Sequence, residues 1–96
     1  MPDPKPKPIH PGEILREDFL PEYELTPGAL ARALHVPRDR IEKLVRGQRS
    51  VTADTAIRLA RYFGTTPQFW MNLQTNHDLG MVDERSVAVI KSRTAA

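Results

Sequence analysis

Hydrophobic positions recur at intervals of three and four residues along most of the chain, which is the spacing of amphipathic α-helices. Residues 52–64 show it most clearly, because their apolar side chains follow the i, i+3, i+4, i+7 pattern. These side chains are Ala56, Leu59, Ala60 and Phe63. Thr52 can cap the first turn of such a helix and Gly64 can end it. The pattern therefore predicts an amphipathic helix between these two residues.

Another helix is predicted near the start of the patterned region, over residues 10–20. Pro11 stands in its first turn, where a missing backbone N–H does no harm, and Pro21 ends it. The face that we expect in the core consists of Ile14, Leu15, Phe19 and Leu20.

The last predicted helix opens with the cap-then-proline pair Thr66-Pro67 and runs to about Leu79, with Gly80 as its stop. Its aromatic pair and Leu73 are expected in the core, because a small bundle gains much buried area from such side chains. The aromatic pair is Phe69 and Trp70.

Residues 26–49 predict two helices separated by a tight turn. Thr26 can cap the first helix, and Pro37 can open the second with its φ already fixed. The two core faces consist of Leu30, Ala31 and Leu34 and of Ile41, Leu44 and Val45. The small side chain of Ala31 would let the helices cross closely, and Val36 would fill the corner between them. A short helix, a tight turn and a basic second helix are typical of a DNA-reading helix-turn-helix.

These elements predict an all-α fold of five helices, with a DNA-binding domain over residues 9–80. Residues 1–8 alternate proline with charge and are expected to form a flexible basic arm. Residues 81–96 differ in character, because 86–90 is apolar and β-favouring. This tail could be a frayed end, a strand that pairs across a dimer, or a segment that packs on another protein.

The charge of the chain is unevenly distributed, although its formal net charge is only +2. Residues 37–49 carry five basic side chains against two acidic ones, whereas residues 12–25 carry five acidic side chains against one basic one. A domain with one basic face orients in the field of a polyanion and displaces counterions from phosphates. The basic segment coincides with the second helix of the motif, which favours DNA as the partner.

Several other classes of function are excluded by what the sequence lacks. There is no cysteine for a disulfide or a thiolate zinc site, and no apolar stretch of the roughly 20 residues needed to cross a bilayer. No hydrophobic secretion signal is visible, so we expect a soluble cytoplasmic protein with no membrane partner. His10, His35 and His77 are far apart and show no metal-ligand spacing. We expect no catalytic residue, metal or cofactor, and no enzyme.

The second helix of the motif is the predicted DNA-reading element, and the residues around it complete the predicted site. Outward side chains of this helix are expected close to base edges or phosphates, and Thr26 and the following loop are expected to hold the flanking backbone. The predicted DNA-binding residues are Thr26, Arg38, Asp39, Arg40, Lys43, Arg46, Gln48 and Arg49. One such domain reads few base pairs, so we expect a homodimer on a palindrome with half-sites about 34 Å apart or a multiple of that. The last helix and the tail are its expected dimer surface.

Several strings of the sequence, spread over about Ile9 to Leu79, together resemble a HigA-type antitoxin of the Xre/Cro-like helix-turn-helix group. The opening HPGE and the closing PxFWxNLQ are the most specific of them. The strings are His10-Pro-Gly-Glu-Ile-Leu, Arg40-Ile41, Gly47, Arg49, and residues 52–56, 58–60, 63–65 and 67–74.

The resemblance implies a dimeric antitoxin of a type II toxin–antitoxin pair. Such an antitoxin binds a HigB-type, RelE-like toxin, which is a ribosome-dependent mRNA endonuclease, and represses the operon that encodes both proteins. The alternative is a protein-interaction module that sequesters a toxin without transcriptional control.

Two positions depart from the Xre-like pattern. Pro27 stands where a glutamine often reaches a phosphate, so Thr26 must supply any contact from that end. His35 stands at a turn position usually taken by glycine, and it must therefore tolerate a left-handed backbone.

Overall fold

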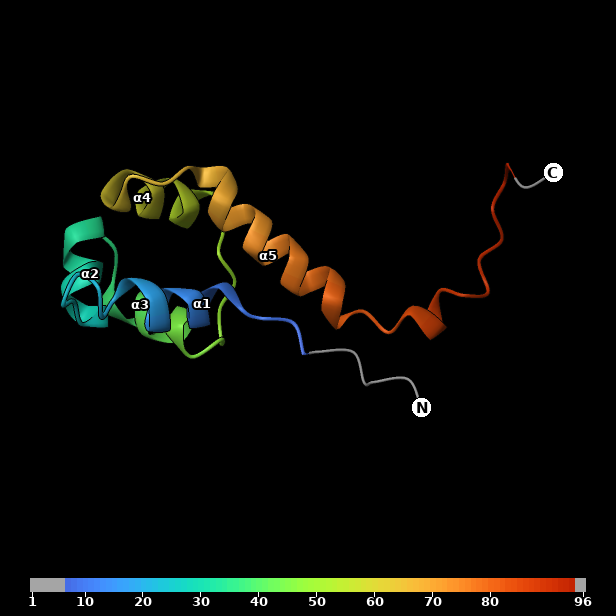
Figure 1. Ribbon diagram of the computed structural model, residues 1–96, viewed down its shortest axis with the longest axis horizontal. Helices are drawn as coiled ribbons and strands as arrows, with labels where there is room; N and C mark the ends of the chain where they lie inside the picture. Colours follow the sequence, from blue (N-terminus) through green and yellow to red (C-terminus); the bar gives the residue numbers. More distant parts are fainter. Residues whose placement is uncertain (1–6, 95–96) are drawn as a thin grey trace.

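The computed structural model describes residues 7–94, which form a helical domain followed by an extended tail (Figure 1). The α-helices of this region are α1 (Pro11–Ile14), α2 (Pro27–Leu34), α3 (Arg38–Val45), α4 (Ala53–Phe63) and α5 (Pro67–Met81). Residues 7–94 contain no strand, so the predicted all-α fold with five helices is confirmed. Most of the predicted basic arm, residues 1–6, lies outside the described residues.

The first helix changes type part-way along. α1 continues into η1 (Leu15–Phe19), a π-helical turn in which the Leu20 N–H donates to the Leu15 carbonyl over 2.9 Å. The start of α1 is set by His10, whose Nδ1 accepts from the Gly12 N–H at 2.8 Å. A Cβ at Gly12 would lie 1.8 Å from the Leu44 carbonyl oxygen of α3. Glycine is therefore required where α1 crosses α3.

Threonine caps begin three helices, as the sequence predicts. The hydroxyl of Thr26 accepts from the Ala29 N–H at 3.1 Å, and Thr52 and Thr66 make the corresponding bonds in α4 and α5. His35 ends α2 in the left-handed conformation, with φ 57° and ψ 45°. The left-handed backbone expected at His35 is thus confirmed.

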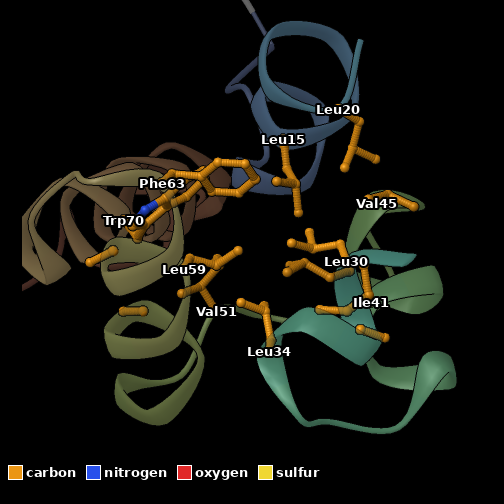
Figure 2. Packing of buried hydrophobic residues seen from close by; sticks show 14 residues of the cluster. Leu15, Leu20, Leu30, Leu34, Ile41, Val45, Val51, Leu59, Phe63 and Trp70 are labelled. Carbon is orange, nitrogen blue, oxygen red and sulfur yellow. The ribbon is translucent and has the colours of Figure 1, made fainter. Parts of the chain in front are cut away.

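The core lies between α1, η1 and the four longer helices, and Figure 2 shows their apolar side chains converging. Leu15, Leu30, Ile41, Leu59 and Trp70 are fully buried. The predicted core faces of α2, α3 and α4 are confirmed in full. Trp70 also satisfies its indole N–H by donating to the Thr65 hydroxyl over 2.8 Å, so its burial leaves no polar atom unpaired.

Two details of the prediction are wrong. Phe69 is not a core residue: Trp70 occupies the core side of α5, and Phe69 is 38 % exposed. Gly80 does not stop α5, which ends at Met81; a Cβ at Gly80 would lie 2.8 Å from Pro8, so this glycine allows the N-terminal segment to pack closely. Pro37 opens α3 as the sequence predicts, as its N-cap with φ −61°.

The C-terminal tail runs away from the domain (Figure 1). Its regular structure is one short 3₁₀ turn, η2 (Glu84–Ser86), and every described residue after Gly80 is exposed. The radius of gyration is 16.7 Å, compared with about 12.5 Å for a compact domain of this length, because the tail projects. Val89 and Ile90 are 80 % and 72 % exposed, so the tail buries little against its own chain.

Candidate nucleic-acid interface

The helix-turn-helix is formed by α2, the turn at residues 35–37 and α3. Ala31 is buried between the helices, as its small size predicts, and the Val36 N–H donates to the Ala31 carbonyl over 3.0 Å. From α4, the Arg58 guanidinium donates to the Leu34 carbonyl over 2.8 Å. The turn is therefore held both by its own backbone and by a side chain from another helix.

The outward face of α3 carries two ion pairs of i, i+4 spacing. Arg38 pairs with Glu42, and the Lys43 ammonium lies 3.1 Å from the Asp39 carboxylate. Arg38, Lys43 and Asp39 are exposed and Glu42 is partly buried. Such surface pairs stabilise a helix only slightly, so the two basic side chains can exchange their partners for a phosphate or a base. Four side chains are thus pre-oriented on this face.

Unpaired positive charge lies just beyond the end of α3. Arg46 and Arg49 are exposed, and neither forms an ion pair within residues 7–94. Gly47, with φ 72°, reverses the chain between them, and the Gln48 N–H donates to the Lys43 carbonyl over 2.9 Å. Phosphates meeting this loop would encounter guanidinium groups that have no ion pair to break.

The start of α2 lies beside the start of α3. The side chain of Arg38 comes within 3.4 Å of the position that a Cβ would take on Gly28. Thr26 caps the same end of α2 and is exposed. Its hydroxyl already accepts from Ala29, but its proton remains available for a phosphate oxygen. The structure therefore places Thr26, which is predicted to contact the DNA backbone, beside α3, which is predicted to read the bases.

Arg40 is placed differently from the other predicted site residues. Its side chain is only 25 % exposed, and its Nη1 donates to Asp54 of α4 at 2.9 Å. The same carboxylate oxygen accepts from Arg58 at 3.0 Å. Hydrogen bonding from Arg58, supported by Arg40, holds the pKa of Asp54 below its usual value. Arg40 thus links α3 to α4 through a shared carboxylate.

Two residues that support the site were not found from the sequence. Gln74 of α5 is buried; its Oε1 accepts from the Val51 N–H at 2.7 Å, and its Nε2 donates to Asp78 at 2.8 Å. Arg16 donates to the Val45 carbonyl at the end of α3 over 2.9 Å. Both anchor the segment that carries Arg46 and Arg49. The one indication in the sequence concerned Gln74, a polar residue four positions after Trp70 and therefore on the core side of α5.

A further contact links α1 to α5 near this segment. The ring centroids of His10 and His77 are 4.8 Å apart, in an edge-to-face arrangement. Both rings line an open groove of about 720 Å³ between α1 and the end of α3. Partial burial lowers the pKa of His10, and repulsion from His77 lowers it further. Within residues 7–94, no group of three or more histidine, cysteine or acidic side chains could hold a metal ion.

Comparison with known proteins bears directly on this arrangement. A helix-turn-helix family model, HTH_3, matches residues 15–70. Virulence-associated protein I of Dichelobacter nodosus is 55 % identical over 84 residues, which cover 85 % of this chain and 78 % of that protein. Antitoxin HigA-1 of Vibrio cholerae is 41 % identical over 75 residues, covering 78 % of this chain and 70 % of that one. The chain belongs to the HigA-type antitoxins of the helix-turn-helix family.

A solved structure supports the same assignment over nearly the whole fold. The Pseudomonas aeruginosa antitoxin HigA, solved with the higBA promoter, superimposes with a TM-score of 0.87 and 46 % identity, covering 92 % of this chain and 99 % of that one. The family is a DNA-binding class, and this chain is an antitoxin-type regulator rather than an enzyme. Among the described residues, no helix is both long and apolar enough to cross a membrane.

Proposed function

We propose that this chain binds the operator of its own operon as a homodimer, represses that operon, and neutralises a HigB- or RelE-like mRNA endonuclease. The observation that carries the proposal is the pair of i, i+4 ion pairs on the outward face of α3, followed by two exposed arginines without an ion pair just beyond the end of the helix. The resemblance to a HigA antitoxin solved with its promoter supports the same conclusion.

The proposed contacts follow from the positions of the side chains. α3 enters the major groove and presents Arg38, Asp39, Lys43 and Arg46 to base edges and nearby phosphates. Thr26, Gln48 and Arg49 hold the flanking backbone. Arg40 acts mainly by holding α3 against α4 through Asp54, and any contact that it makes with DNA requires its ion pair to open.

The proposed dimer surface is the end of α5 together with the tail. This segment carries a run of exposed apolar side chains. They are Leu79, Met81, Val82, Val87, Val89 and Ile90. Exposed apolar surface of this extent is typical of a contact with another chain. The proposed organisation is therefore an arm (1–8), a DNA-binding domain (9–80) and an associating tail (81–96).

Titration of the purified protein into labelled DNA from upstream of its own gene tests this function. Fluorescence anisotropy should show specific binding that is at least about a thousandfold tighter than binding to a scrambled duplex at the same salt concentration. Equal affinity for both duplexes, together with retained binding to the toxin, would instead support a sequestering module without transcriptional control.

A further inference from the structure

Arg38, the first residue of α3, is held by two neighbours. Its Nε donates to a carboxylate oxygen of Glu42, one turn further along the same helix. Its Cδ and Cζ lie 3.5 and 3.6 Å from the position that a Cβ would take on Gly28, which is buried at the start of α2. Glu42 is the more buried partner, with 28 % of its side chain exposed against 74 % for Arg38. The inner part of the arginine side chain is therefore fixed, although the side chain as a whole stays accessible.

The ion pair leaves the outer edge of this guanidinium free. A guanidinium carries five N–H donors, and the pair with Glu42 uses the one on Nε. Within the part of the chain that the structure describes, the Nη1 and Nη2 atoms of Arg38 make no hydrogen bond. Two such nitrogens form a fork that matches O6 and N7 of guanine in the major groove, which is the commonest specific contact of a basic side chain with a base. Arg38 can therefore bind a base and keep Glu42 as its partner.

The second ion pair of the outward face of α3 differs in kind. Lys43 contacts Asp39 through a compact ammonium group, and the two side chains are 50 % and 68 % exposed. An ammonium is a point charge on a flexible stem, so it attracts phosphates without presenting a fixed fork to one base. Of the two pairs, the pair of Arg38 with Glu42 is the one whose free donors have a set direction.

We propose that Glu42 gives the protein a preference for guanine by holding Arg38 as the reading side chain, an inference that rests on the operator-binding function proposed above. The N-terminal residues of a recognition helix contact the base edges, and Arg38 occupies that end of α3. A free arginine loses rotamer freedom when it binds, and one that is already held loses less. Glu42 is thus a positioning residue, which acts through Arg38 and touches no base.

The charge of Glu42 makes this role separable from simple electrostatics. A carboxylate on the face that meets DNA is repelled by the phosphates, so its removal alone should strengthen binding to any duplex. If Glu42 positions Arg38, its removal should instead weaken binding to the operator, while binding to unrelated DNA stays equal or becomes tighter. The two explanations therefore predict changes of opposite sign in operator affinity.

The test compares the operator duplex with a scrambled duplex of the same length, by fluorescence anisotropy at one salt concentration. Glu42→Ala should lower the ratio of the two affinities about tenfold, and circular dichroism should show it folded because alanine favours helix. Glu42→Gln should keep most of the ratio, because its amide oxygen can still accept from Nε of Arg38. The matched control for the loss of one negative charge is Glu22→Gln. Glu22 is exposed in the turn after η1, outside the predicted site, so both affinities should stay within about twofold.

Operator duplexes with one G·C pair exchanged at a time identify the base that is read. One position, with its counterpart in the other half-site, should carry a penalty in the wild type that Arg38→Ala abolishes. Glu42→Ala should reduce the penalty at that same position. Arg38→Lys should behave like Arg38→Ala, since lysine lacks the fork.

The possible results separate the two proposals. A wild type that binds the operator and the scrambled duplex equally refutes the operator-binding function and this inference with it. If the wild type prefers the operator but Arg38→Ala weakens binding to every duplex equally, Arg38 holds a phosphate; the function then stands and the inference is refuted. The inference is also refuted if Glu42→Ala keeps the wild-type ratio. It fails as well if Glu42→Ala relaxes a different base pair from Arg38→Ala, because Glu42 would then contact a base itself.

Discussion

Replacing Gln74 with leucine is expected to destabilise the protein more than its position on a surface helix suggests. Gln74 is only 4 % exposed, and its Oε1 is the acceptor for the backbone N–H of Val51, which is itself buried. Leucine has nearly the same volume, so the packing is largely preserved. The Val51 N–H, however, is left without its acceptor in a place that water does not reach.

An unsatisfied buried backbone N–H costs about 1–3 kcal/mol of unfolding free energy. For a domain of this size, each kcal/mol lowers the melting temperature by about 4–8 °C, so Gln74→Leu should melt roughly 4–24 °C below the wild type. Circular dichroism at 222 nm during heating measures this shift. The matched control is Gln68→Leu. Within the described part of the chain the Gln68 side chain bonds only to Asn72, on the exposed side of the same helix, so this substitution should change stability by less than about 0.5 kcal/mol.

The result that would refute this reasoning is a Gln74→Leu protein that melts within about 2 °C of the wild type. It would mean that the Val51 N–H finds another acceptor, or that its bond to Gln74 makes no net contribution to the free energy of unfolding. The variant should also bind operator DNA more weakly, since Val51 follows the loop that carries Gln48 and Arg49.

Three further predictions test other parts of the structure. Ala31→Leu should overpack the crossing of α2 and α3 and cost about 1–3 kcal/mol in a urea titration; an unchanged midpoint would show that Ala31 is not at the crossing. Because the folded-state pKa of His10 is lowered, the unfolded chain binds its proton more readily, so stability should fall as pH drops below about 6.5. His10→Asn, which retains a capping side chain, should lose most of that dependence; an equally steep loss would place its origin elsewhere. Deleting residues 81–96 should leave the helical domain folded but weaken self-association in sedimentation, and an unchanged association state would remove the tail from the dimer.

The local structure of the domain could be predicted from the sequence, because it depends on residues close in the chain. The caps at Thr26, Thr52 and Thr66 and the buried faces of α2 to α4 follow from such local signals, whereas the left-handed backbone at His35 is expected from the resemblance to the Xre-like pattern. Such signals fix where each helix begins and which side it buries.

The supporting contacts of the site could not be predicted in this way. Gln74 reaches a backbone group 23 residues away, and Arg58 reaches one 24 residues away, so neither partner is visible from spacing. Arg40 looks like one more basic residue of α3 until α4 brings Asp54 beside it. Phe69 and Trp70 are neighbours of similar character, and only the packing of α5 in the fold shows that Trp70 is the buried one.

Operator affinity of α3 variants tests the central claim most directly. We would measure the dissociation constant of the wild type, Arg38→Ala and Lys43→Ala for the upstream duplex by fluorescence anisotropy at several salt concentrations. Each substitution should weaken binding by about 1–3 kcal/mol, because each removes a contact to a base edge or phosphate and leaves Glu42 or Asp39 without its ion-pair partner. Circular dichroism should show both variants folded, since neither side chain faces the core. Wild-type affinity in both variants at moderate salt would contradict the claim that α3 reads the operator.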